Sequence, residues 1–146
     1  APGVIPLDVQ HLPYKEETFK CICFDPPFLA SSGSKKYKKC MQSRFGSFSN
    51  IYALYDFYNQ SLSELYRVLD NRGILIIKCQ DVVNGRKQYL SHVHIINIAN
   101  TLGLYCIDLF ILLAKSRLLG PIKKQQHARK YHSYFLVFKK QRKPGL

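Results

Sequence analysis

Apolar residues along this chain form four short continuous runs, which predict β-strands. The runs occupy residues 19–24, 74–77, 106–114 and 133–140. The first run stops at Asp25-Pro26-Pro27, where two residues without an amide proton cannot continue a sheet ladder. The second run has no polar alternation, which is typical of a strand covered on both faces.

Between the first two runs, apolar residues recur at spacings of three and four, which predicts an amphipathic helix. This stripe consists of Ile51, Leu54, Tyr55, Tyr58, Leu62, Leu65, Tyr66 and Leu69. Ser49 and Asn50 precede the stripe and can cap a helix. A turn over residues 70–73 ends it with a glycine able to take a positive φ. A second helix is predicted over residues 91–104, with Gly103 near its end.

The order strand, helix, strand, helix, strand, strand predicts an α/β fold with a mostly parallel sheet and helices on both faces. The last two strands have no helix between them, so we expect them to pair as an antiparallel hairpin at one edge. Two polar segments, residues 29–48 and 115–132, are predicted loops. Loops of this length tend to be functional.

Positive charge is concentrated in particular segments of the chain. The net charge is +13, and 14 of the 22 Lys and Arg residues follow residue 70, together with only two of the nine acids. One basic cluster, in the first loop, contains Lys35, Lys36, Lys38, Lys39 and Arg44. The second, in the later loop, contains Lys123, Lys124, Arg129 and Lys130. Unpaired charge of one sign favours a polyanionic partner, and nucleic acid is favoured over an anionic membrane or an acidic protein.

Cysteine usage and hydropathy indicate an intracellular, cytoplasmic protein that does not span a membrane. The five cysteines are an odd number without zinc-type spacing, so we expect reduced and mostly buried thiols and no metal site. The longest apolar run, residues 106–114, has nine residues including Asp108, which is too short to cross a bilayer. No leader peptide is visible.

The segment that follows the first strand, Asp25-Pro26-Pro27-Phe28, combines groups that can hold an aromatic amine. Ligands of open α/β sheets bind beyond the carboxyl ends of strands. The Asp25 carboxylate and the Pro26 carbonyl can each accept a hydrogen bond from an amino group, while Phe28 offers a face on which a base can stack. The competing interpretation is a plain strand terminator.

This tetrapeptide resembles the catalytic motif of S-adenosylmethionine-dependent methyltransferases that modify exocyclic amines of nucleic-acid bases. Asp8 and Val9, with the Leu-Pro and Phe-Lys pairs that follow, are similar to the family stretch that approaches the cofactor adenine. Residues 65–78 resemble its usual helix-to-strand passage, and residues 132–139 its closing strand.

The resemblance implies a Rossmann-like methyltransferase fold, with a catalytic domain over residues 1–140 and a basic tail over residues 141–146. It implies Asp25, Pro26, Pro27 and Phe28 as catalytic residues, Asp8, Val9 and Asp25 as cofactor contacts, and S-adenosylmethionine as cofactor. The family binds this cofactor on a glycine-rich loop, and no GxG occurs here. We therefore expect the C-terminal two-thirds of the fold, without its N-terminal strands. A permuted family member is the less favoured alternative.

Three functions are compatible with these features. The favoured one is methylation of an adenine or cytosine amine in DNA, because the closing strand is similar to those of DNA enzymes. The alternatives are an RNA base methyltransferase and a non-catalytic nucleic-acid-binding subunit. We expect both basic loops and the basic tail to flank Asp25. His92 and His94 have no acid nearby in sequence and receive no role.

Overall fold

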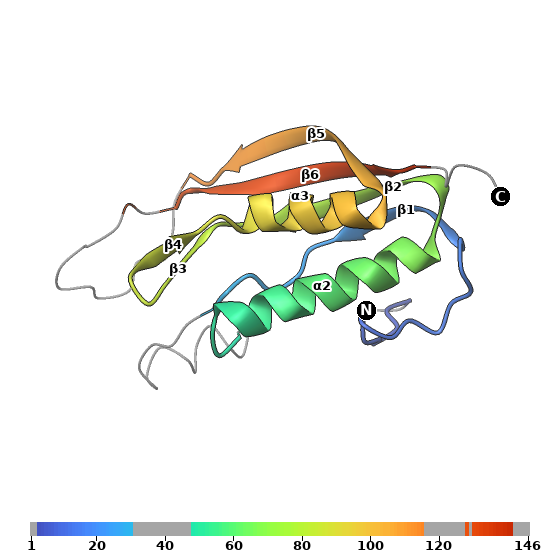
Figure 1. The fold of residues 1–146 in the computed structure, drawn as a ribbon, viewed down its shortest axis with the longest axis horizontal. Coiled ribbons are helices and arrows are strands. Elements are labelled where there is room, and N and C mark those ends of the chain that lie inside the picture. Colours follow the sequence, from blue (N-terminus) through green and yellow to red (C-terminus); the bar gives the residue numbers. More distant parts are fainter. Residues whose placement is uncertain (1–2, 31–47, 116–127, 129, 142–146) are drawn as a thin grey trace.

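The computed structural model describes residues 3–30, 48–115, 128 and 130–141, and it contains six strands and two helices within them (Figure 1). In chain order these are β1 (Phe19–Phe24), α2 (Ile51–Val68), β2 (Leu69–Cys79), β3 (Val82–Asn84), β4 (Lys87–Tyr89), α3 (Ser91–Leu102), β5 (Leu104–Leu113) and β6 (His132–Lys140). The four runs and both helices expected from the sequence are present. The β3–β4 hairpin was not expected.

The main sheet has four strands in the order β1-β2-β6-β5. Strand β1 is parallel to β2, whereas β6 is antiparallel to both β2 and β5. Three of the four strands therefore point the same way, and β6 lies between two of them in the opposite direction. The described sheet is therefore mixed: β1 and β2 form a parallel pair, and the expected antiparallel hairpin of β5 and β6 is present at one edge.

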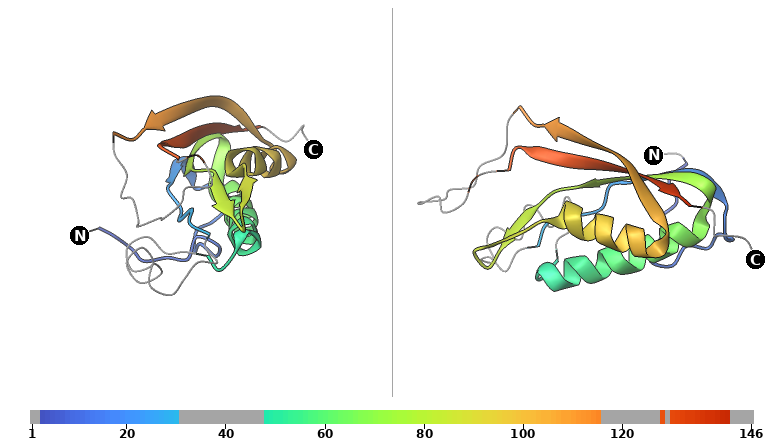
Figure 2. Two further views of the ribbon diagram at one scale, coloured as in Figure 1. Left: turned by 90° about the vertical axis from the view of Figure 1, so that its left-hand side faces the viewer. Right: turned by 45° about the horizontal axis from the view of Figure 1, so that its top comes forward.

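Both helices lie on the same face of the sheet, where they contact each other (Figure 2). The expectation of helices on both faces was therefore wrong for the described residues. The reason is topological: the crossovers from β1 to β2 and from β2 to β5 move across the sheet in the same direction. Right-handed crossovers that move in one direction place their helices on one side.

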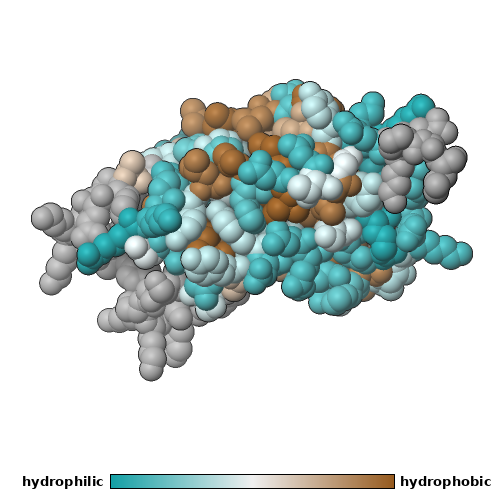
Figure 3. Space-filling model, in the orientation of Figure 1, coloured by the Kyte–Doolittle hydropathy of each residue, from teal (hydrophilic) through white to brown (hydrophobic). Residues whose placement is uncertain are grey.

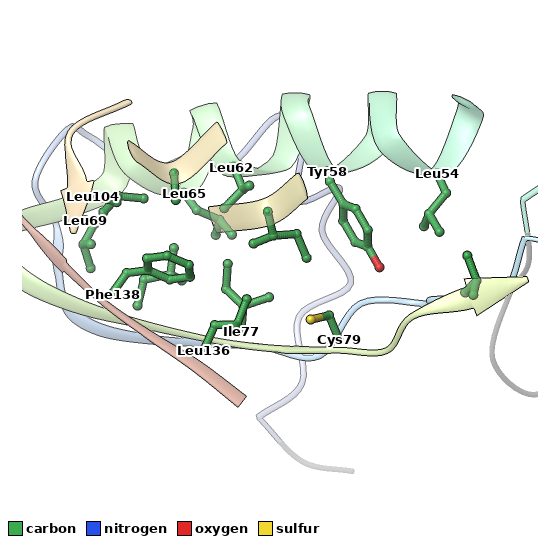
Figure 4. Packing of buried hydrophobic residues seen from close by; sticks show 14 of the residues in the cluster. Leu54, Tyr58, Leu62, Leu65, Leu69, Ile77, Cys79, Leu104, Leu136 and Phe138 are labelled. Carbon is green, nitrogen blue, oxygen red and sulfur yellow. The ribbon is translucent and has the colours of Figure 1, made fainter. Parts of the chain in front are cut away.

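The core lies between these helices and the sheet. The α2 stripe is buried at Ile51, Leu54, Tyr58, Leu62 and Leu65, and it packs on alternate residues of β2 and β6. In Figure 4 the Tyr58 ring extends from α2 toward Cys79 at the end of β2. Burial raises the pKa of the Cys79 thiol to about 12. The apolar stripe thus fixes α2 along the face formed by β2 and β6.

The α2 helix begins and ends close to the predicted positions. The Asn50 side chain caps it, accepting a hydrogen bond from the amide of Ala53 at 2.9 Å. At the other end, the turn expected over residues 70–73 is part of β2, where the pairing with β1 shifts register. The left-handed conformation expected at Gly73 is adopted by Arg72 (φ 62°) instead. Gly73 is needed for a close approach, because a Cβ there would lie 2.8 Å from the carbonyl oxygen of Asp70.

Two features of the surface are the exposed cysteines of β1, which were not expected, and the apolar side chains of β5. All four described cysteines are free thiols, but Cys21 and Cys23 are exposed on β1, so the prediction of mostly buried thiols was wrong for this pair. Strand β5 carries a series of exposed apolar side chains, seen as the brown surface along the top of Figure 3. Within the described residues, no helix has the length and hydropathy to cross a membrane.

Candidate active site

The candidate site begins where β1 ends, beside the end of β2. Asp25 directly follows β1, and its side chain is 62% exposed. Because β1 and β2 are parallel and in register from Cys21 to Phe24, their carboxyl ends lie side by side. This brings the Nζ atom of Lys78 to 2.8 Å from Oδ2 of Asp25. Lys78 is the last residue of the helix-to-strand passage over residues 65–78, and the sequence did not predict a role for it in the site.

The residues after Asp25 are held in place on both sides. Pro26 is buried, and Pro27 and Phe28 are half-buried. The backbone amide of Phe48 donates a hydrogen bond of 2.8 Å to the carbonyl of Leu29, and Ala30 forms a parallel bridge with Phe48. The chain therefore leaves this segment at Ala30 and returns beside it at Phe48. The paired ends fix the Pro-Pro-Phe segment against the sheet.

A second group of polar side chains lies just beyond β2. The Asp81 side chain is 5% exposed, and its Oδ1 lies 2.7 Å from Nδ1 of His92, at the start of α3. The hydroxyl of Tyr134 on β6 donates to Oδ2 of Asp81 at 3.4 Å. The Tyr134 ring also stacks on His92, with centroids 4.2 Å apart.

The expectation that His92 has no partner acid was therefore wrong. Asp81 precedes His92 by eleven residues, with the β3–β4 hairpin between them. Spacing alone gave no signal for this contact. The burial of Asp81 and the three contacts identify the group as a structural junction of β2, α3 and β6 beside the candidate site. Within the described residues, no cluster of His, Cys, Asp and Glu is suited to hold a metal ion.

The residues expected at the cofactor lie on the segment that precedes β1. Asp8 is exposed, and one of its carboxylate oxygens accepts a hydrogen bond of 3.0 Å from the amide of Gln10. Val9 is half-buried against the core. Arg67 on α2 holds this segment by donating to the carbonyls of Leu12 and Tyr14. The structure records no hydrogen bond or ion pair between Asp8 and Asp25.

Most of the predicted nucleic-acid contacts lie outside the described residues. These are Lys35, Lys36, Lys38, Lys39, Arg44, Lys123, Lys124 and Arg129, whereas Lys130 is described and half-buried. It precedes β6 and lies near His132, which pairs with Leu113 at the carboxyl end of β5. The start of β6 is therefore at the same end of the sheet as Asp25.

Most of the predicted basic tail, residues 142–146, lies outside the described residues, but the direction of the strand before it is known. Strand β6 runs antiparallel to β2: Tyr134 is paired with Cys79 at the end of β2, and Lys139 with Ile74 in its middle. Strand β6 therefore ends on the side of the sheet opposite Asp25, where its arrowhead lies in Figure 1. Lys140, the last residue of β6, has a structural role: its buried ammonium donates hydrogen bonds to the carbonyls of Tyr66 and Leu69.

Comparisons by sequence give no match: no protein-family model matches the chain, and no curated protein resembles it. Comparison of the fold is informative. A protein assigned as a DNA modification methylase from Thermus thermophilus, solved in complex with S-adenosyl-L-methionine, superposes with a TM-score of 0.62 at 20% identity. The match covers 91% of this chain and 53% of that protein.

Two further structures show the same similarity. The PvuII cytosine-N4-specific DNA methyltransferase gives a TM-score of 0.62 at 15% identity, covering 87% of this chain and 44% of that enzyme. A SAM-dependent methyltransferase from Methanosarcina mazei gives 0.53 at 9% identity, with coverages of 92% and 65%. The chain thus has a Rossmann-like methyltransferase fold, and it spans about half the length of the two DNA methylases.

Proposed function

We propose that the protein containing this chain transfers a methyl group from S-adenosylmethionine to an exocyclic amine of a DNA base, adenine or cytosine. The main support for this proposal is the position of Asp25-Pro26-Pro27-Phe28, which directly follows β1 and lies beside the end of β2 in a methyltransferase fold. Fold alone does not decide chemistry. The proposal therefore rests on the groups at this position, and residues 1–140 are proposed as part of the catalytic domain.

The proposed chemistry needs little from the protein beyond position and polarity. An aromatic amine is a weak nucleophile, because its lone pair is delocalised into the ring. One Asp25 oxygen and the Pro26 carbonyl would each accept a hydrogen bond from the amine and stabilise the positive charge that grows on nitrogen. The N–C bond would form as the S–C bond to the methyl group breaks, and one amine proton would then be lost, with the thioether of the cofactor as leaving group. Phe28 would hold the plane of the base. The ion pair with Lys78 leaves Oδ1 of Asp25 for the substrate.

The described residues fit one part of an S-adenosylmethionine site. Asp8 is exposed and has a carboxylate oxygen that can accept from the adenine amine, and half-buried Val9 beside it offers an apolar contact for the ring. When bound, the cofactor supplies an electrophilic methyl group on sulfur. Asp8 and Val9 would orient its adenine, and Asp25 would approach the methyl group together with the substrate amine.

DNA is proposed ahead of RNA because two of the matched structures are described as DNA methylases. The unbalanced positive charge supports a nucleic-acid substrate of either kind. Assays with duplex DNA and with RNA of the same sequence separate these substrates. Binding without methyl transfer by the wild-type protein would favour the non-catalytic alternative.

The decisive experiment is Asp25→Ala in the protein that contains this chain. Loss of one hydrogen-bond donor of an oxyanion hole typically costs about 10²–10³ in rate, and the loss of an acceptor of the growing positive charge is taken to be of the same order. We expect methyl transfer from labelled S-adenosylmethionine to fall by at least this factor while nucleic-acid binding is retained. Asp56→Ala, which removes an exposed acid on α2, is the matched control and should leave transfer unchanged. Unchanged turnover of Asp25→Ala contradicts the assignment.

A further inference from the structure

The β3–β4 hairpin is a two-residue turn that carries two positive charges at its tip. Asn84 pairs with Lys87, so Gly85 and Arg86 form the turn. Both have positive φ, 56° and 65°, the geometry of a type I′ turn that matches the twist of the strands. For an arginine this left-handed conformation is uncommon and unfavourable. Its presence here is not explained by turn stability, for which glycine or asparagine is better suited.

The hairpin is anchored beside the candidate active site at both ends, by Asn84 next to the turn and by Val82 and Tyr89 at the base. The Asn84 side chain donates a hydrogen bond of 3.2 Å to the carbonyl of Ala30, two residues after Phe28. Val82 is buried in the core, and the Tyr89 ring meets Tyr55 of α2 edge-on, with centroids 6.4 Å apart. The Asn84 hydrogen bond thus joins the hairpin to the chain just after Phe28, and the other two contacts join it to the core and to α2. Figure 1 shows the hairpin extending beyond the carboxyl ends of β1 and β2.

The hairpin tip is exposed and has no compensating acid. Arg86 and Lys87 are both exposed, and no Asp or Glu occurs between residues 82 and 90. The structure records no ion pair for either side chain, a statement that covers the described residues only. The Lys87 ammonium lies 5.6 Å from the centre of the Tyr89 ring, which restricts this side chain. The tip thus presents two cations on an ordered support.

We propose that the β3–β4 hairpin binds the phosphodiester backbone next to the target base, through Arg86 and Lys87. This inference rests on the proposed function, and it names a contact surface that the predicted basic clusters do not include. Phosphate contacts fix the register of a protein on nucleic acid without reading its sequence. A short, anchored hairpin suits this role, because its position relative to Phe28 is set by the Asn84–Ala30 hydrogen bond.

The test compares two double variants that remove the same charge from opposite ends of the sheet. Arg86→Asn with Lys87→Gln neutralises the tip, and asparagine suits the left-handed position. Arg72→Asn with Lys20→Gln is the matched control. Both of its residues are exposed, Arg72 is also left-handed (φ 62°), and both lie near the starts of β1 and β2. Thermal unfolding checks that each variant is folded.

Binding is measured by fluorescence anisotropy over a salt series, with labelled duplex DNA and duplex RNA of one sequence. Each lost phosphate contact lowers the slope of log affinity against log salt by about 0.9 on duplex DNA. The slope of the tip variant should therefore be less steep than that of wild type by about 1.8. Between about 50 and 200 mM salt, the factor by which its affinity falls should then be about ten times smaller than the factor for wild type. A less steep salt dependence with duplex DNA, with duplex RNA or with both shows which nucleic acid supplies the phosphates that the hairpin contacts.

Two results would overturn the proposal: an unchanged salt slope in the tip variant, or an equal loss in the control variant. Arg86→Asn is expected to leave the melting temperature unchanged or higher while weakening binding, a combination that a purely structural role does not produce. The outcome is separable from that of Asp25→Ala. If the tip variant keeps the wild-type salt slope and Asp25→Ala is inactive, only the proposed hairpin contact is contradicted. If Asp25→Ala stays active and the tip variant loses slope, only the methyl-transfer assignment is contradicted.

Discussion

The Nζ atom of Lys78 lies 2.8 Å from Oδ2 of Asp25 and connects the carboxyl ends of the two parallel strands β1 and β2. The lysine side chain is 27% exposed and the aspartate side chain 62%. An ion pair this exposed contributes little to stability, about 1 kcal/mol or less. Its consequence is orientation, because a carboxylate held through Oδ2 presents Oδ1 in a defined direction.

Lys78→Met should therefore reduce methyl transfer without unfolding the protein. We expect a fall of about tenfold in kcat, since misplacement of a reacting group is costly, and a change of less than about 1 kcal/mol in the free energy of unfolding. Single-turnover methyl transfer and urea denaturation measure the two effects. Lys78→Arg should restore most of the rate. Faster transfer by Lys78→Met would show instead that the ammonium competes with the substrate amine for Asp25.

The buried carboxylate of Asp81 should be important for stability. Asp81→Ala removes the carboxylate that accepts hydrogen bonds from the His92 ring and the Tyr134 hydroxyl. Both part-buried groups then lose this hydrogen-bond partner. We expect a loss of about 1–3 kcal/mol in the free energy of unfolding. Urea denaturation at neutral pH checks this value. Asp56→Ala, on the exposed face of α2, is the control and should change it by less than about 0.5 kcal/mol.

The ion pair of Glu64 and Arg67 predicts a stability change in acid. Hydrogen bonds from Arg67, and one from the Leu12 amide, lower the pKa of Glu64 from 4.5 to about 2. A carboxyl group whose pKa is lowered by folding stabilises the fold above its unfolded-state pKa. That contribution is lost as the pH falls from about 4.5 through about 2.

Wild type should therefore be more stable than Glu64→Gln at pH 7, and the difference should shrink across this acidic range. Chemical denaturation at a series of pH values measures it. Arg67→Met removes the main cause of the shift and should show the same reduced dependence on pH. Parallel curves for wild type and Glu64→Gln across the acidic range would contradict the assignment.

Local patterns were sufficient for the elements that position the candidate site. The apolar stripe from Ile51 to Leu65 predicts α2, and the two prolines after Asp25 end β1 where they do because they cannot donate to a ladder. The hairpin over residues 82–89 was missed. Its strands have three residues each, and its turn places an arginine where Gly or Asn is usual.

The sequence by itself determined which segments become strands and helices, where β1 stops, and which four residues follow it, because these depend on periodicity and on proline geometry. Tertiary structure decided the contacts across the chain: Lys78 with Asp25, Asp81 with His92 and Asn84 with Ala30, and it decided that β6 ends away from the site. These depend on strand order and direction. Residues far apart in sequence meet only once the crossovers place β2 beside β1 and reverse β6.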